Sequence, residues 1–319
     1  LNFMKICIFL FFLYHGHSLA YKQGNVGNIE MGLKYKNRRP QNEPGNFFVD
    51  ESCIDCDACR WIAPDTFSRV GLGSIVHQQP RTHEEKVQAV RAMLSCPVGS
   101  IRTMKGDPFV KKVASEFPFP IVASGESELA EVFHLGYHSK DSYGATPYLI
   151  TPPSNNNIMI DIPRFNGALA DKIEKMGGIK YLIVTHIDNT SNHQSWKRRF
   201  PNLIRIMHRF DTVPDTRNFE CILEGEGPWN LSEDEADSLE EGKILYIPGH
   251  TLGSIAFLYE RGKAIFTGDT VGYSSRRGRL DGWSLYNRGG IERQAKSMEK
   301  LSKENFLWML SSRGKVKFS

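Results

Sequence analysis

The stretch ESCIDCDACRW, residues 51–61, places Cys53, Cys56 and Cys59 at strict three-residue steps. A fourth cysteine, Cys96, stands before a proline in the stretch MLSCPVGSI. Thiolates at this spacing can bind three corners of a cubane iron–sulfur cluster, and the fourth corner then needs a thiolate from elsewhere in the chain. The pattern predicts one [4Fe-4S] cluster, because the chain contains a single set of such cysteines.

A zinc site, a disulfide pair and chance are the three alternatives to a cluster at these cysteines. Structural zinc sites usually combine two C-x2-C units or include histidine, which fits this cysteine run less well. Over about residues 46–104 the chain resembles the small single-cluster ferredoxins of the bacterial type, in CIDCDAC and CPVGSI. Of the remaining cysteines, Cys7 lies in the N-terminal leader, and Cys221 is isolated and typical of a buried apolar residue.

Two carboxylates, Asp55 and Asp57, stand between the cluster ligands. Negative charge beside a cluster disfavours an added electron, so they would lower the reduction potential of the cluster. The alternative is that both are solvated loop carboxylates.

Length and charge narrow the function classes. The chain has 319 residues, of which 40% are hydrophobic, so it can form one large domain and a small one. The net charge of +4 is mild, and no basic stripe is interleaved with aromatic residues. We therefore predict no nucleic-acid partner.

The N-terminus is typical of a targeting leader. Residues 1–20 combine a lysine, a short apolar core and a small-residue cleavage site, which predicts a signal peptide. The apolar run is too short to span a bilayer, so we expect no stable membrane anchor. Residues 21–43 are basic and poor in apolar residues, which predicts a transit-like segment or a linker.

The leader and the cysteines make conflicting predictions about the compartment. A signal peptide alone indicates the secretory pathway, but oxidising compartments favour disulfides, and an exposed cluster would not survive well there. A signal peptide followed by a transit segment resolves this conflict. We predict a plastid of the secondary or apicoplast type, with the secretory pathway as the alternative.

The pattern after the cysteine module alternates strands and helices, which predicts a second domain over residues 110–319. We expect strands in PYLITPP and NIMIDIP, joined as a hairpin, and in YLIVTH, KILYIPGH, SIAFLYE and KAIFTGD. We expect helices in HEEKVQAVRAML of the first domain and in LADKIEKMG and IERQAKSMEKL of the second.

Three turns that follow expected strands carry candidate metal ligands. The turns are VTHIDNTSNHQSW with His186, Asp188 and His193, PGHTLGS with His250, and FTGDT with Asp269. Together, and in this order, they resemble the metallo-β-lactamase fold of glyoxalase II-like hydrolases. The resemblance implies an αββα sandwich behind a small α+β ferredoxin-like domain. It also implies a metal-activated water that attacks a carbonyl or phosphoryl centre.

The chain departs from the family pattern T-H-x-H-x-D-H at two ligand positions. Asp188 replaces the second histidine, and Asn192 stands before His193 where the family has an aspartate. The last ligand histidine of the family corresponds to Arg313, which cannot bind a metal because it stays protonated.

These departures change the expected metal content. One metal position keeps His186, Asp188 and His250, whereas the other keeps only His193 and Asp269. We therefore expect one metal ion, or none, rather than a pair. A carboxylate in place of an imidazole shifts the preference from zinc toward iron or manganese.

Three residues are candidates for the chemistry beyond metal binding. Asp188 and Asp269 would act at the metal, and Arg313 would replace the missing cation and hold a substrate carboxylate or phosphate. The alternative for Arg313 is exposure to solvent. His208 is a reserve ligand candidate that is more typical of a structural histidine. The segment at 267–290 resembles a plant, algal and plastid-type subgroup that joins a ferredoxin module to this fold.

Three hypotheses of function follow. The first is a metal-dependent hydrolase acting on a small ester, thioester or phosphoryl compound. The second is an iron-dependent oxidoreductase fed by the cluster, with an electron donor such as a ferredoxin reductase. The third is a non-catalytic protein for electron transfer or binding.

Overall fold

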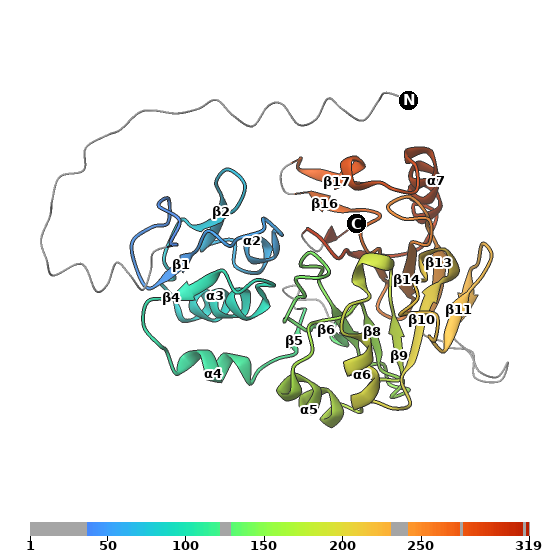
Figure 1. The fold of residues 1–319 in the computed structure, drawn as a ribbon, viewed down its shortest axis with the longest axis horizontal. Coiled ribbons are helices and arrows are strands. Elements are labelled where there is room, and N and C mark those ends of the chain that lie inside the picture. The colour runs from blue at the N-terminus through green and yellow to red at the C-terminus, as the bar shows by residue number, and fades with distance from the viewer. Residues whose placement is uncertain (1–36, 122–128, 231–241, 275–276, 315–316, 319) are drawn as a thin grey trace, which may run out of the picture. The chain divides into compact units, whose positions relative to one another are not determined.

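The computed structural model describes residues 37–121, 129–230, 242–274, 277–314 and 317–318 (Figure 1). The expected signal peptide, residues 1–20, and most of the basic segment at 21–43 lie outside the described residues. Residues 37–319 form one compact unit by their backbone contacts. None of the described helices has the length and apolar character needed to cross a membrane.

The first module pairs short strands around a capped helix. Its elements are β1 (Phe47–Val49), α2 (Ala58–Ile62), β2 (Phe67–Arg69), β3 (Ser74–Val76), α3 (His83–Ser95), β4 (Ile101–Thr103) and α4 (Phe109–Ala114). β1 pairs with β4 and β2 with β3, both antiparallel. α3 confirms the helix expected in HEEKVQAVRAML, and it begins with a capping box in which Thr82 and Glu85 satisfy each other's backbone amides.

This module begins earlier than the sequence predicts. Asn42, within the segment expected to be a linker, is buried, and its side chain bonds Val49 in β1 and accepts from the amide of Val76 in β3. Arg38 forms a β-bridge with Asp50. Residues 37–43 therefore belong to the folded module, because a buried amide must find partners that a linker would not supply.

Two sheets form the second module. The first has the order β11-β10-β9-β8-β7-β6-β5 and the second the order β12-β13-β14-β15-β18-β19. The strands of the first are β5 (Phe119–Pro120), β6 (Val132–His134), β7 (Tyr148–Ile150), β8 (Ile158–Ile160), β9 (Tyr181–Ile183), β10 (Ile204–His208) and β11 (Cys221–Leu223). Those of the second are β12 (Trp229–Asn230), β13 (Gly242–Tyr246), β14 (Ile255–Tyr259), β15 (Ala264–Phe266), β18 (Trp308–Leu310) and β19 (Lys317–Phe318). A separate hairpin contains β16 (Gly272–Ser274) and β17 (Arg279–Asp281).

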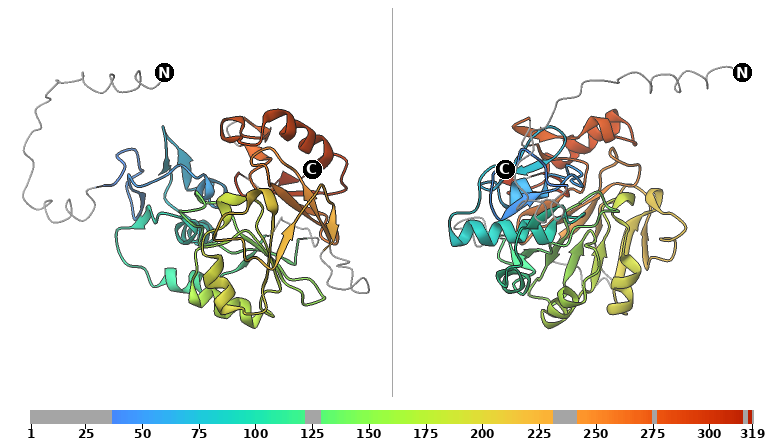
Figure 2. Two further views of the ribbon diagram at one scale, coloured as in Figure 1. Left: turned by 45° about the vertical axis from the view of Figure 1, so that its right-hand side comes forward. Right: turned by 60° about the vertical axis from the view of Figure 1, so that its left-hand side comes forward.

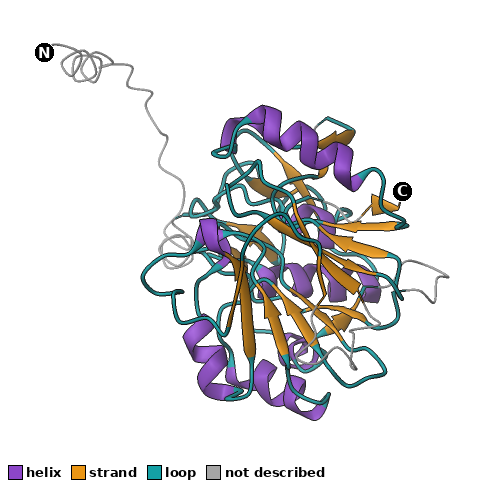
Figure 3. Cartoon of the chain, turned by 90° about the vertical axis from the view of Figure 1, so that its right-hand side faces the viewer, coloured by secondary structure: helices purple, strands orange, loops and turns teal. Residues whose placement is uncertain are grey.

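Helices cover the outer faces of both sheets, as Figures 2 and 3 show. α5 (Gly167–Lys175) and α6 (His193–Arg199) follow strands of the first sheet, and α7 (Ile291–Leu301) precedes β18 of the second. Alternation along β9 explains this arrangement: Tyr181 and Ile183 join the core between the sheets, whereas Leu182 joins the core beneath α5 and α6. Leu301 packs with the outer face of the second sheet. The architecture confirms the predicted αββα sandwich.

The two modules share one hydrophobic core. The core beneath α5 and α6 contains Leu182 and Trp196, and it continues without a break to Val49, Cys59 and Val90 of the first module. Trp196 is fully buried, and its indole Nε1–H donates to the carbonyl of Pro163.

Candidate functional site

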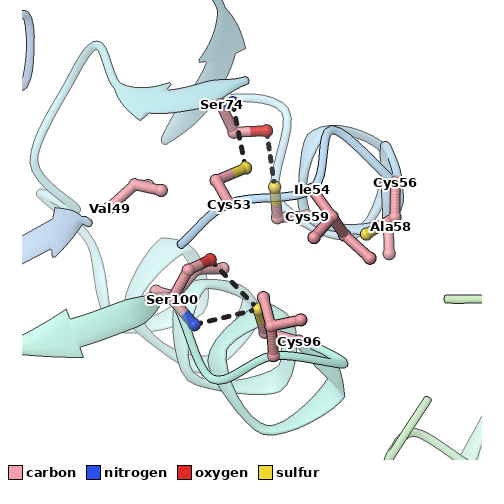
Figure 4. Close-up of a pocket in the computed structure, with 11 residues that line it drawn as sticks. Val49, Cys53, Ile54, Cys56, Ala58, Cys59, Ser74, Cys96 and Ser100 are labelled. Atoms are coloured by element: carbon pink, nitrogen blue, oxygen red, sulfur yellow. Dashed lines mark hydrogen bonds between the residues drawn. The ribbon is translucent and has the colours of Figure 1, made fainter. Parts of the chain in front are cut away.

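The four motif cysteines line a single pocket, which Figure 4 shows. Left-handed backbone at Asp55 and Asp57, with φ of 56° and 75°, folds the cysteine run around the pocket, and Cys96 ends α3. The five described cysteines form no disulfide. The pocket is also lined by Val49, Ile54, Ala58, Ser74, Val98, Ser100 and Ile101.

Hydrogen-bond donors surround the sulfur atoms. The amide of Ser74 lies 3.4 Å from Cys53 Sγ, and that of Ser100 lies 3.3 Å from Cys96 Sγ. Burial raises the pKa of the Cys56 thiol to about 12, so bound iron is needed to hold this sulfur as a thiolate at neutral pH. Four converging thiols with amide donors and apolar walls fit a [4Fe-4S] cluster.

Asp55 and Asp57 are ion-paired rather than solvated. Arg60 donates to Asp55 Oδ1 at 2.9 Å and to Asp57 Oδ1 at 2.6 Å, and Arg69 also contacts Asp55. The pairing offsets the two negative charges. Their expected effect on the cluster potential is therefore largely cancelled.

Gly144 lies directly against this pocket. Its φ is +84°, and an added Cβ would lie 2.7 Å from Cys56 Cβ and 3.1 Å from its Sγ. We expect Gly144→Ala to displace Cys56, to lower the cluster content measured by iron analysis and visible absorption, and to add about 1–2 kcal/mol of backbone strain. Gly106→Ala is the control, because nothing lies within 4 Å of its added Cβ. Equal iron content in both variants would contradict the prediction.

The second site forms where the turns after β9, β13 and β15 meet. His186 precedes the 3-10 helix η2 (Ile187–Asn189), which contains Asp188. His186, Asp188 and His250 each offer one donor atom, and these atoms lie within 4.8 Å of one another. Asp188 Oδ2 is 3.3 Å from His250 Nε2 and 3.7 Å from His186 Nε2. Asp269 Oδ2 is 3.8 Å from His186 Nε2 and 3.9 Å from His250 Nε2.

Three side-chain atoms of these candidate ligands are buried without a hydrogen-bond partner among the described residues, namely His186 Nε2, His250 Nδ1 and Asp269 Oδ1. Burial lowers the pKa of His186 to about 4, so the imidazole is neutral at neutral pH. Two imidazoles and two carboxylates around one point suit a divalent zinc, iron or manganese ion. The unpartnered atoms fit such an ion because buried polar atoms otherwise find partners.

Asp161 orients His186 through the hydroxyl of Thr185, and it is not among the site residues predicted from the sequence. The Thr185 hydroxyl lies 3.0 Å from His186 Nδ1 and 2.9 Å from Asp161 Oδ1, and the Ser312 hydroxyl donates to Asp161 Oδ2 at 2.7 Å. Because the Thr185 hydroxyl donates to the carboxylate, it accepts from Nδ1–H, which assigns the lone pair of His186 to Nε2. The only signal in the sequence was the position of Asp161 at the end of the NIMIDIP strand.

We expect Asp161→Asn to weaken metal binding by about 10–100-fold, because the amide no longer accepts all of these donors and His186 loses its orientation. Competition with a chelator measures this affinity. Asp215→Asn is the matched control, since Asp215 bonds His193 and not the candidate ligands. A metal affinity that is equal in both variants would contradict the role of Asp161.

A second missed carboxylate, Asp211, joins two of the ligand turns. It accepts from the amide of Ile187 at 2.9 Å, from the amide of Gly253 at 2.8 Å and from the Thr251 hydroxyl at 2.6 Å. Ile187 is next to His186 in the chain, and Thr251 is next to His250. Asp211 therefore fixes the spacing of these two candidate ligands.

The structure corrects the expected ligand set at His193. This residue begins α6, and both of its ring nitrogens are engaged elsewhere: Nε2 lies 2.8 Å from Asp215 Oδ2, and Nδ1 lies 2.9 Å from Arg205 Nη1. His193 is thus not brought to the other candidate ligands. His208 stacks on Tyr246, and its Nε2 lies 3.2 Å from the carbonyl of Gly225, which is a structural environment.

Arg313 lies at the site and not in solvent. Its Nε donates to Asp269 Oδ2 at 2.7 Å, and its two Nη atoms donate to the carbonyls of Tyr143 and Ser142. Burial tends to raise the pKa of Asp269, but the charge of Arg313 and interactions with His186 and His250 lower it overall. Arg288 forms a similar pair with Asp188 at 2.6 Å.

Two families match this chain. Residues 49–103 match the family described as the 4Fe-4S single cluster domain of Ferredoxin I, and residues 148–304 match the metallo-beta-lactamase superfamily. A hydroxyacylglutathione hydrolase of Pelagibacter ubique (strain HTCC1062) is 26% identical over 136 residues, which are 41% of this chain and 52% of that protein. The chain thus spans about half the length of this curated relative.

Solved structures resemble the fold at low sequence identity. The DIM-1 metallo-beta-lactamase has a TM-score of 0.47 at 14% identity, over 63% of this chain and 92% of its own. TTHA1623 in a di-iron-bound form has a TM-score of 0.41 at 18% identity, over 63% of this chain and 94% of its own. The Flv1 flavodiiron core of Synechocystis sp. PCC6803 has a TM-score of 0.40 at 14% identity, over 58% and 54% of the two chains.

Proposed function

We propose that this chain, a metallo-β-lactamase-fold protein with an N-terminal single-cluster ferredoxin domain, is a one-metal hydrolase of small thioesters or esters. One observation carries the proposal. Donor atoms of His186, Asp188, His250 and Asp269 converge, while Arg313 lies against Asp269. A fixed positive charge beside Asp269 disfavours a second metal ion there, so one ion is expected.

Different residues of the chain have different roles at this site. A metal ion held there would supply Lewis acidity and lower the pKa of a coordinated water. His186 and His250 would bind the ion through their imidazoles, and Asp188 and Asp269 would balance its charge. Asp269 Oδ1, which has no partner among the described residues, is available to accept a proton.

The surroundings of the site suggest the kind of substrate. The side chain of Arg288 is about half exposed, at 54%, and its guanidinium can bind a carboxylate or phosphate of an entering substrate. Leu252 lies two residues after His250 in the chain, and Phe210 lies one residue before Asp211. The side chains of both are exposed. A small anionic substrate with an apolar part fits these groups.

Metal analysis and thioester hydrolysis test the proposal together. We expect protein purified without oxygen to hold one metal ion beyond the cluster, and to cleave a hydroxyacylglutathione thioester, the compound class in the relative's name, only when that ion is present. Arg288→Met should raise KM more than it lowers kcat if Arg288 binds the substrate anion. Two ions per chain, or no cleavage of thioester and ester probes by the loaded protein, would overturn the proposal.

An iron-dependent oxidoreductase fed by the cluster is the second candidate. The observation that favours it is Asp188, since a carboxylate among the ligands favours iron over zinc. In that case about five irons per chain are expected, four of them from the cluster. The reduced protein would then pass electrons to a small-molecule oxidant after reduction by a ferredoxin reductase.

A plastid location of the secondary or apicoplast type remains part of the proposal. It is supported by the composition of residues 1–20 and 21–43 and by the redox demands of the cluster cysteines. A fluorescent fusion of residues 1–43 tests it, and delivery of the fusion to the secretory pathway would contradict it.

A further inference from the structure

A short loop joins the cluster pocket to the second site. Gly144 contacts Cys56 at the pocket, as the close approach of its Cβ position shows. One residue earlier, the carbonyl of Tyr143 accepts from Arg313 Nη1 at 2.9 Å, and that of Ser142 accepts from Nη2 at 3.3 Å. The third nitrogen of the same guanidinium, Nε, donates to Asp269, so Arg313 connects a candidate metal ligand to the wall of the cluster pocket.

The loop is held firmly in this position. The amide of Gly144 donates to the carbonyl of Ser139 at 2.9 Å, and its carbonyl lies 2.9 Å from His138 Nδ1. His138 is fully buried, and its other nitrogen lies 3.3 Å from a nitrogen of His134. Because these hydrogen bonds hold the loop at 142–144 in place, a displacement of Arg313 can be transmitted through the loop to Cys56.

Electrostatics connect the same groups. Burial raises the pKa of Cys56, and Arg313 is one of the charges that oppose this shift. Burial tends to lower the pKa of Arg313, but Asp269 and, to a smaller degree, Cys56 raise it overall. The charge of Arg313 thus acts on both sites, although its hydrogen bond to a carboxylate is made at only one of them.

We infer that Arg313 couples the oxidation state of the iron–sulfur cluster to the occupancy of the metal site, and this inference rests on the metal site of the proposed function. A divalent ion at the site would interact with the carboxylate of Asp269 and weaken the ion pair between Asp269 and Arg313. Arg313 is then less neutralised, and its positive charge favours an added electron on the cluster. The cluster is reduced by one electron from an external one-electron carrier, and no bond forms or breaks.

The coupling must be reciprocal. If the ion makes the cluster easier to reduce, then a reduced cluster binds the ion more tightly by the same factor. We expect a factor of at least about five, which is the lower end for coupled sites in proteins. A factor of ten corresponds to about 59 mV for a one-electron couple.

The test measures the midpoint potential of the cluster in the full chain, by a redox titration followed by electron paramagnetic resonance. The potential is measured with a chelator and with saturating Zn²⁺, which is not itself reduced, and calorimetry confirms Zn²⁺ binding separately. In the wild-type chain Zn²⁺ should raise the midpoint potential of the cluster. The rise should correspond to at least about a fivefold tighter binding of Zn²⁺ to the reduced than to the oxidised form. In Arg313→Met most of this shift should disappear while Zn²⁺ still binds.

Arg288→Met is the matched control. Arg288 also pairs with a site carboxylate, since its Nη2 donates to Asp188, but within the described part of the chain it does not bridge to the loop at 142–144 as Arg313 does. The Arg288→Met variant should keep the rise in midpoint potential that Zn²⁺ causes in the wild-type chain. If Arg313→Met does not fold, Arg313→Gln replaces it, since a glutamine removes the charge but can still donate hydrogen bonds.

The outcomes separate this inference from the proposed function. If Zn²⁺ does not bind the wild-type chain, the proposed metal site itself is wrong. If Zn²⁺ binds and the potential stays constant, only the coupling is wrong. A shift that is equally lost in Arg288→Met, or fully kept when Arg313 is replaced by methionine or glutamine, would also overturn the role of Arg313.

Discussion

Replacement of Cys59 by alanine is expected to remove the cluster and to lower the free energy of unfolding by more than about 4 kcal/mol, a size typical of the loss of a bound metal group. Cys59 is 7% exposed and lies in the core that the two modules share. Loss of its thiolate leaves an incomplete ligand set in a buried pocket. Iron analysis, visible absorption and urea unfolding without oxygen measure the effect.

Cys221→Ala is the matched control for this experiment. Cys221 lies in β11 of the first sheet and does not line the cluster pocket. We expect this variant to retain its iron and to lose about 1 kcal/mol of stability or less. Retention of a full cluster by Cys59→Ala would contradict the ligand assignment.

The second large effect is expected at the metal site. His250→Ala should weaken metal binding by more than about 100-fold, because loss of an outer partner alone costs 10–100-fold. Its Nε2 lies within the donor group of His186 and Asp188. Chelator competition measures the affinity, and thioester hydrolysis should fall with metal occupancy.

His193→Ala provides the decisive comparison. The sequence predicts that His193 binds metal, whereas the structure places it between Asp215 and Arg205. We therefore expect unchanged metal affinity, together with a loss of about 1–3 kcal/mol because Arg205 loses a buried partner. Loss of metal from His193→Ala but not from His250→Ala would restore the ligand set expected from the sequence.

Local patterns predicted the elements well, because they depend on neighbouring residues. The hairpin of β7 and β8, the buried strand β9 and the helix α7 all form where periodicity and turn residues place them. Three of the candidate ligands, His186, Asp188 and His250, also meet as expected, since each follows a strand at the same edge of the sandwich.

Long-range partners could not be predicted in the same way. His193 has the spacing of a ligand, but Arg205 and Asp215 bind it from later segments of the chain. Asp161 and Asp211 look like ordinary loop carboxylates until Thr185, Ser312 and the ligand turns surround them. Their roles arise from tertiary contacts that no local spacing specifies.

The core shared by the two modules has a consequence for handling the protein. Val49 and Cys59 of the first module pack in one cluster with Leu182 and Trp196 of the second. Cutting the chain between the modules would expose apolar surface on both halves, so separately expressed halves should aggregate. Heating should likewise melt the whole described unit in a single cooperative transition, in contrast to a carrier domain attached by a tether.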